Sequence, residues 1–175
     1  MRYVAFLRAI NTGNRRIKMA GVRALYEDLG YSDVATYIAT GNVIFDAHSP
    51  PPPLELELSF AERFGFTSEV FLRSGEEVRS ILDAVPWRGD DAVVEVSFLE
   101  REPGVSEARS LEATAVAPEQ LVVSGREVFF LRGRGRGAPT THKESTSMDL
   151  LNMKMTRRGM ATVDQIYARF LHPRM

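Results

Sequence analysis

One polar loop, residues 8–18, carries the residue types best suited to binding an anion. Its candidate ligand-binding residues are three backbone-flexible residues and four cations: Asn11, Gly13, Asn14, Arg8, Arg15, Arg16 and Lys18. A helix is expected directly after this loop, and a helix N-terminus offers free N–H groups with a partial positive charge. The combination fits a phosphate or a carboxylate. The loop has neither the Gly-Lys-Ser/Thr of a Walker loop nor a Gly-x-Gly-x-x-Gly fingerprint, so it specifies no particular ligand.

A structural interpretation of the same loop competes with the functional one. Asn and Gly also turn a chain, and Arg8 would then pair with an acid elsewhere in the fold. A second candidate segment is the turn Thr40-Gly41-Asn42, which would complete the site if it lies beside the loop. The competing interpretation of that turn is a plain hairpin connection.

The C-terminal part adds a second set of cations. Arginine and glycine alternate from Arg132 to Gly137, as in flexible segments that bind nucleic-acid backbones, although a solvated loop has the same composition. Arg157, between Thr156 and Arg158, would extend a basic patch if it folded near the first loop. Arg157 is therefore included among the candidate ligand-binding residues.

Catalytic and metal-binding patterns are sparse. His48, His142 and His172 are each interpreted as ordinary surface histidines, since none is followed by a second histidine at ligand spacing and the chain has no cysteine. Ser145, Thr146 and Ser147 follow His142, but neighbours in sequence are seldom the partners of a triad. We therefore expect no metal and no cofactor, and the sequence leaves open whether the chain is an enzyme.

Composition limits the class of protein. The 175 residues are 44% hydrophobic and 26% charged, which are ordinary globular values. No apolar run approaches the roughly 20 residues of a membrane helix, so we expect no membrane partner and a cytoplasmic location. The net charge of −1 divides into 0 over residues 1–73, −7 over 74–131 and +6 over 132–175. The basic ends could attract phosphates, or could neutralise the acidic middle within one fold.

The elements that would position the loop form a regular series. The pattern predicts a strand at residues 3–7, a helix from Met19 to a stop at Gly30, and a hairpin over residues 36–45. A proline linker, a helix at 54–64 and a strand at 67–72 follow. The order β-α-β-β-α-β predicts a ferredoxin-like unit with an antiparallel sheet, assigned to residues 1–73.

The remaining residues, 74–175, are assigned to a second α/β sub-domain. Ser74-Gly75-Glu76-Glu77 is a capping-box signature that opens a helix. A strand at 93–99, a helix at 105–115 and a hairpin over 121–131 follow, and a helical region is expected from about Lys143 to Phe170, broken near Gly159. The series loosely echoes the first half. The fold class is therefore α+β, with two ferredoxin-like sub-domains related by a structural duplication.

The N-terminal residues carry a resemblance to a known family. Leu7-Arg8-Ala9-Ile10-Asn11-Thr12-Gly13, the helix start at Met19 and the segment from Thr36 to Phe45 resemble the bacterial domain of unknown function 1697. The resemblance implies two ferredoxin-like sub-domains and no catalytic residues, because that family has no assigned reaction. Ala9 and Asn14 stand where the family typically has glycine. The Asn-Trp pair of the family's C-terminal element is absent from residues 155–162.

Three hypotheses for function follow. The first is a binding module for a phosphorylated small molecule or a nucleic acid, using the first loop. The second is an enzyme that acts on a small anionic metabolite in a cleft between the sub-domains. The third is an interaction or oligomerisation protein, whose oligomeric state the sequence does not give. We favour the first, because loop residues carry function more often than core residues do.

Overall fold

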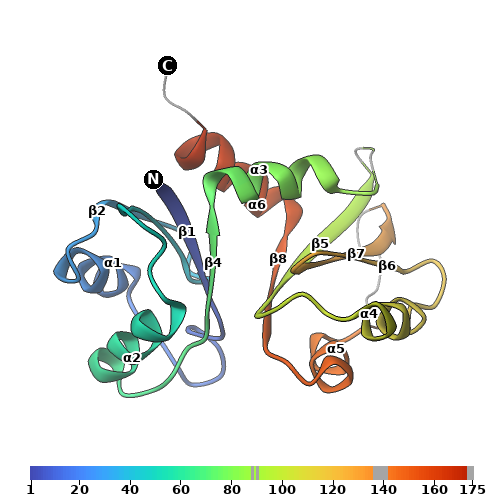
Figure 1. The fold of residues 1–175 in the computed structure, drawn as a ribbon, viewed down its shortest axis with the longest axis horizontal. Helices are drawn as coiled ribbons and strands as arrows, with labels where there is room; N and C mark the ends of the chain where they lie inside the picture. The colour runs from blue at the N-terminus through green and yellow to red at the C-terminus, as the bar shows by residue number, and fades with distance from the viewer. Residues whose placement is uncertain (88, 90, 136–141, 173–175) are drawn as a thin grey trace. The chain divides into compact units, whose positions relative to one another are not determined.

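A computed structural model of the chain describes residues 1–87, 89, 91–135 and 142–172. It divides into two compact units, residues 1–79 with 165–175, and residues 80–164. Each unit contains one four-stranded antiparallel sheet and two helices that pack on it (Figure 1). The predicted α+β class with two sub-domains is therefore observed at this level.

The first unit begins with the series of elements that the sequence predicts. They are β1 (Arg2–Leu7), α1 (Met19–Asp28), β2 (Ser32–Tyr37), β3 (Asn42–Asp46), α2 (Pro53–Phe64) and β4 (Val70–Ser74). The strand order is β2-β3-β1-β4, and every neighbouring pair is antiparallel. The register of the central pair places Tyr3 opposite Phe45 and Ala5 opposite Val43.

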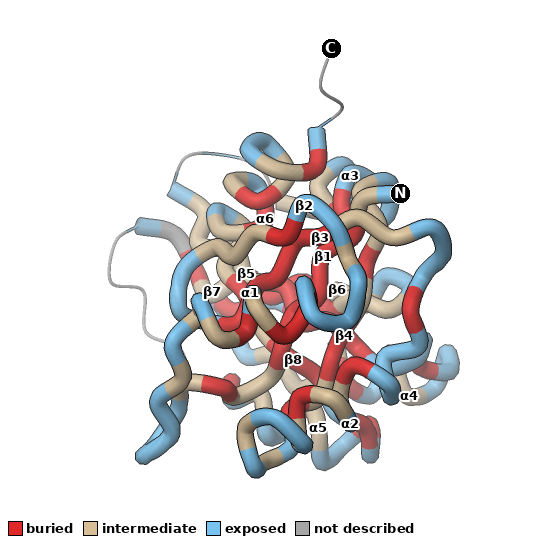
Figure 2. The backbone as a smooth tube through the Cα atoms, turned by 90° about the vertical axis from the view of Figure 1, so that its left-hand side faces the viewer, coloured by how far each residue is buried: buried red, intermediate tan, exposed pale blue. Residues whose placement is uncertain are grey.

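The core of the first unit lies between the sheet and its two helices. Tyr3, Leu7 and Phe45 of the sheet pack with Tyr26 of α1 and Phe60 of α2 in one buried cluster. Val4, Phe6 and Ile44, on the opposite face of the sheet, are also buried. β1 and β3 are thus buried on both faces, and for β1 this agrees with the continuous apolar run at residues 3–7. In Figure 2, β1 and β3 are coloured mainly as buried, whereas exposed residues are frequent in the loops.

The second unit repeats the order of elements. It contains β5 (Ala92–Leu99), α4 (Val105–Glu112), β6 (Gln120–Ser124), β7 (Glu127–Arg134), α5 (Glu144–Leu151) and β8 (Met155–Gly159). Its strand order, β6-β7-β5-β8, places the strands in the positions equivalent to those of the first sheet. Leu111 of α4 and Leu151 of α5 pack on Leu99, Phe130 and Met155 of the sheet.

The C-terminal region differs from the expected helical region. Residues 143–170 form α5, then the strand β8, then α6 (Met160–Ile166) and the π-helical turn η1 (Tyr167–Leu171). β8 was not predicted because methionine and arginine favour helices and the segment has only one β-branched residue, Thr156. Pairing with β5, from Leu99 opposite Met155 to Glu95 opposite Gly159, makes it a strand. The expected loop from Arg132 is likewise in part a strand, since β7 continues to Arg134, whereas residues 136 and 137 lie outside the described residues.

The division between the units falls within two helices. The helix α3 (Gly75–Ala84) begins in the first unit, and the segment from Gln165 to the C-terminus also belongs to the first unit. The sequence assigned both to the second sub-domain. The reason lies in contacts of η1: Arg2 Nε donates a hydrogen bond to the Phe170 carbonyl at 2.9 Å, and the Phe170 ring lies 6.0 Å from the Tyr37 ring.

Candidate functional site

The loop after β1 is fixed at its start by Arg8. Arg8 Nη1 lies 3.3 Å from Glu69 Oε2, and both side chains are about a quarter exposed. The Arg8 amide also donates to the Glu69 carbonyl at 3.0 Å, and the Ser68 hydroxyl donates to the Arg8 carbonyl at 2.8 Å. The structural interpretation of Arg8 is therefore supported, because its charge is compensated by an acid of the β4 region.

Asn11 connects the two ends of the loop to the hairpin. Its Nδ2 donates to the Ala39 carbonyl at 2.8 Å and to the Ile17 carbonyl at 3.2 Å, while the Ile17 amide donates to Asn11 Oδ1 at 2.7 Å. The amide group of Asn11 is thus occupied by backbone groups. The same bonds place the hairpin tip beside the loop. The turn Thr40-Gly41-Asn42 was included in the candidate site on the condition that it lies there.

The three hairpin residues have different positions. Thr40 is exposed, whereas Gly41 and Asn42 are buried. Asn42 Nδ2 donates to the Tyr37 carbonyl at 2.9 Å and to Thr40 Oγ1 at 3.0 Å. Gly41 has a φ of +87°, as expected for a tight turn, but the second residue with positive φ is Ile38, at +51°, rather than Asn42. Asn42 instead closes the turn through its side chain.

Five exposed residues of the loop, three of which are cations, are here called the cationic loop: Gly13, Asn14, Arg15, Arg16 and Lys18. The Arg15 guanidinium lies 4.4 Å from the centre of the Phe66 ring. Arg16 Nη1 donates to the carbonyls of Gly13, at 2.9 Å, and Arg15, at 2.7 Å. Among the described residues, no carboxylate forms an ion pair with Arg15, Arg16 or Lys18, whereas Glu69 pairs with Arg8.

The cationic loop leads directly into α1. Lys18 is the N-cap residue, and no described side chain caps this end of the helix. The first turn of α1, described in full, contains no acidic residue. Both the helix end and the cations before it therefore favour a negatively charged group.

Arg157 lies in the second unit, on β8, and not in the unit that holds the cationic loop. Its Nη1 lies 3.6 Å from Glu95 Oε2, its Nε donates to Ser97 Oγ at 3.2 Å, and its guanidinium lies 5.0 Å from the Phe130 ring centre. Burial lowers the pKa of Arg157, and the Glu95 carboxylate opposes this shift. These contacts fit a role in holding the second sheet together.

Sequence reasoning assigned His142 to the surface, and this was wrong. His142 is buried, and its Nε2 lies 2.7 Å from the hydroxyl of Ser147, which is also buried. Burial lowers the pKa of His142, the positive charge of Arg157 lowers it further, and Glu119 opposes the shift. The only signal in the sequence was the serine five residues later. Ser147 is too deeply buried to meet a substrate, so we interpret the pair as part of the interior of the unit.

Two features are absent from the described residues: a cluster of side chains that could hold a metal ion, and a helix that could span a membrane. No three side chains of the His, Cys, Asp and Glu types gather there in a way that could hold a metal ion. Of the helices described, none combines the length and the apolar character needed to cross a bilayer.

Comparisons with known proteins give a family and a fold without an activity. The family described as "Protein of unknown function (DUF1697)" matches residues 1–129. No curated protein matches the chain. Among solved structures, the chain is similar to one described as conserved bacterial protein SP0830 from Streptococcus pneumoniae. That protein is 25% identical, with a TM-score of 0.76 over 95% of this chain and 97% of the other.

Proposed function

The chain belongs to the DUF1697 family, and we propose that it binds a phosphate-bearing anion at the cationic loop of its first unit. The observation that carries this proposal is the group of three exposed cations, Arg15, Arg16 and Lys18, which no carboxylate of the described residues neutralises. Arg15 and Arg16 present guanidinium groups that suit phosphate oxygens, and Lys18 adds a point charge at the helix end.

The equivalent loop of the second unit is a useful internal comparison. It connects β5 to α4, and it is short, with two acidic residues and one arginine: Glu100-Arg101-Glu102-Pro103-Gly104. Here Arg101 Nη1 lies 2.9 Å from Glu107 Oε2, and the Gly104 amide donates to that same oxygen at 2.7 Å. These bonds lower the pKa of Glu107 to about 2. A fold of this kind can therefore close the loop with its own carboxylate, which supports a functional reason for the open charges in the first unit.

We further propose that each unit is a ferredoxin-like sub-domain and that the pair arose by duplication. The support is the shared order β-α-β-β-α-β, together with equivalent strand positions in two antiparallel sheets. The fold by itself implies no ligand, because one fold serves many functions. After such a duplication, the two loops would have diverged, one toward anion binding and the other toward self-capping.

The ligand class is tested by fluorescence anisotropy with labelled single- and double-stranded oligonucleotides at low and near-physiological salt. We expect binding that weakens steeply with salt, because each phosphate contact releases counterions. The double variant R15A/R16A should lower the slope of log K against log salt by about 1.4 for a single strand. The matched control is R23A/R63A, which removes the same charge from two exposed arginines that pair with Glu27 and Asp28.

The alternative ligand, a phosphorylated small molecule, is tested in the same samples by displacing the oligonucleotide with pyrophosphate, and by direct titration of pyrophosphate where no oligonucleotide binds. Binding of pyrophosphate alone, lost in R15A/R16A and kept in R23A/R63A, would assign the site to small phosphorylated compounds. If neither probe binds at low salt, or if both double variants bind as the wild type does, the proposal is wrong.

A further inference from the structure

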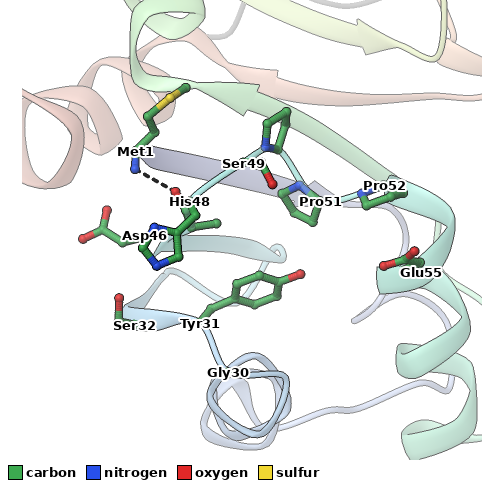
Figure 3. Close-up of a pocket in the computed structure, with 12 residues that line it drawn as sticks. Met1, Gly30, Tyr31, Ser32, Asp46, His48, Ser49, Pro51, Pro52 and Glu55 are labelled. Carbon is green, nitrogen blue, oxygen red and sulfur yellow. Dashed lines mark hydrogen bonds between the residues drawn. The ribbon is translucent and has the colours of Figure 1, made fainter.

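A hollow of about 530 Å³ opens in the first unit where the chain leaves β3 and enters the proline linker (Figure 3). Tyr31 and Ser32 line one side, and Pro51 and Glu55 line the other. Asp46 and His48 lie at the end of β3 and just beyond it. This volume is within the range of small-molecule sites. From the sequence alone, the proline segment after β3 was interpreted only as a linker.

The walls of the hollow are held in place by their own contacts. The Tyr31 ring centre lies 4.7 Å from that of Phe45 and 6.0 Å from that of Tyr26, both of which belong to the buried core. Opposite it, consecutive prolines restrict the backbone and Pro51 is buried. In Figure 3 the Tyr31 hydroxyl points toward the side formed by Pro51 and Glu55. A ligand would therefore meet a preformed surface and would lose little affinity to ordering it.

The charged groups around the hollow include the ammonium group of Met1 and one carboxylate that has no partner among the described residues. Arg2 Nη1 lies 3.4 Å from Asp46 Oδ2 and 3.4 Å from Asp33 Oδ2, and its Nε is bonded to the Phe170 carbonyl. The amino group of Met1 donates to the Ala47 carbonyl at 2.7 Å. By contrast, the Glu55 carboxylate has no hydrogen bond or ion pair to any residue that the structure describes. Tyr31 and Glu55 both line the hollow. Burial raises the pKa of Tyr31, and the negative field of Glu55 raises it further.

We propose that this hollow is a second binding site, which takes a small organic cation with a primary ammonium group. The ammonium pairs with the Glu55 carboxylate and lies against the Tyr31 ring, whose face attracts cations. The hydroxyls of Ser32 and Ser49, both lining residues, supply further acceptors. The site differs from the cationic loop in position and in charge, so this proposal does not depend on the proposed function.

The test is a titration of the uniformly ¹⁵N-labelled full chain with putrescine, followed by amide chemical shifts. We expect saturating shifts at the amides of Gly30, Tyr31, Ser32 and Ala47, and none of comparable size in the second unit. The diol with the same four-carbon chain is the uncharged control and should cause no comparable shifts. Shifts of equal size with the diol, or no shifts with putrescine, would overturn the proposal.

Two variants assign the binding to the proposed groups. Glu55→Gln should weaken putrescine about tenfold, as for the loss of one charge-assisted hydrogen bond. Glu62→Gln, on the same helix but not lining the hollow, is the matched control and should bind as the wild type does. Glu55 lies in the first turn of α2, where a negative charge also stabilises the helix, so affinity is compared only where the amide spectrum shows a folded chain.

Tyr31→Leu keeps an apolar side chain but removes the aromatic face. We expect putrescine to bind about twofold to fivefold more weakly, with shifts still confined to the same amides. Equal affinities for Glu55→Gln and Glu62→Gln would show that the carboxylate makes no contact with the ammonium, and the proposal would fail whatever the Tyr31 variant does.

Discussion

Gly41 and Ile10 approach so closely that a Cβ atom on Gly41 would lie 3.0 Å from Ile10 Cδ1 and 3.1 Å from Leu7 Cβ. Gly41 also has a φ of +87°, and its carbonyl accepts a hydrogen bond from the Leu7 amide at 2.7 Å. The turn between β2 and β3 is thus packed directly against the end of β1, where the loop of residues 8–18 begins.

Replacing Gly41 with alanine is expected to lower the free energy of unfolding by about 2–4 kcal/mol, from left-handed backbone strain together with overpacking. The matched control is Gly13→Ala, since Gly13 has a φ of +58° but a Cβ atom there would meet no other part of the chain within 4 Å. That variant should lose only about 1–2 kcal/mol, the strain alone. Urea unfolding followed by circular dichroism measures both, and equal losses would contradict the packing argument.

Ala9 adopts a φ of +54°, a conformation that costs a residue with a Cβ atom about 1–2 kcal/mol. A glycine at this position would be free of that cost. We therefore expect Ala9→Gly to raise the free energy of unfolding by about 0.5–1 kcal/mol, after the greater flexibility of glycine in the unfolded chain is subtracted. Ala20→Gly, at an exposed position in α1, should instead lower it by about 1 kcal/mol. If Ala9→Gly and Ala20→Gly lower the free energy of unfolding by similar amounts, the backbone at Ala9 is not strained.

Most elements of the fold could be predicted because their signals are local. Ser74 and Glu77 form the predicted capping box, with the Ser74 amide 2.7 Å from Glu77 Oε2 and the Glu77 amide 3.1 Å from Ser74 Oγ. The strand β8 could not be predicted, because its conformation comes from pairing with β5, far away in the sequence. The positive φ of Ile38 could not be predicted either, since β-branched residues rarely adopt a positive φ.

In the candidate site, too, features with a local cause could be predicted from the sequence, and features that depend on distant residues could not. The sequence located the cations of the cationic loop, because their clustering is visible along the chain. It could not show that Arg8, at the start of the same segment, is neutralised, since its partner Glu69 is 61 residues away. It also could not show that Asn11 is used by the backbone of the hairpin. The ligand-binding role of all these residues stays a prediction.

Tyr26 offers a test of the core beneath the first sheet. The side chain is 1% exposed, and its hydroxyl has no hydrogen-bond partner among the described residues. Burial is the main cause that raises the Tyr26 pKa. A buried hydroxyl without a partner costs about 1–3 kcal/mol, so Tyr26→Phe should stabilise the chain by about that amount. A higher midpoint in chemical denaturation is the expected result, and a lower one would mean that the hydroxyl has a partner, such as a bound water.

The buried pair of His142 and Ser147 predicts a pH dependence of stability. The pKa of His142 is lowered in the folded chain, so the unfolded chain binds a proton more readily. The free energy of unfolding should therefore be constant above about pH 6.5 and fall below it, by at most about 1.4 kcal/mol per pH unit.

His142→Gln keeps a group that can bond to Ser147 but cannot titrate in this range. Its difference in stability from the wild type should shrink as the pH falls below about 6.5. His48→Gln, at an exposed histidine, is the control and should retain the pH dependence of the wild type. A constant difference between His142→Gln and the wild type from about pH 7.5 to about pH 5 would contradict a lowered pKa.

Asn11 separates the shape of the cationic loop from its charge. Asn11→Ala removes three hydrogen bonds, to the carbonyls of Ala39 and Ile17 and from the Ile17 amide, but leaves every cation in place. We expect the free energy of unfolding to fall by about 1–3 kcal/mol, because these backbone groups would have to find water instead.

If the loop binds an anion through a fixed arrangement, affinity for the oligonucleotide or pyrophosphate should fall as well, while the salt slope stays near that of the wild type. R15A/R16A should show the reverse, with a lower salt slope and nearly unchanged stability. An Asn11→Ala variant that is destabilised but binds with full affinity would mean that charge alone attracts the anion, without a formed site.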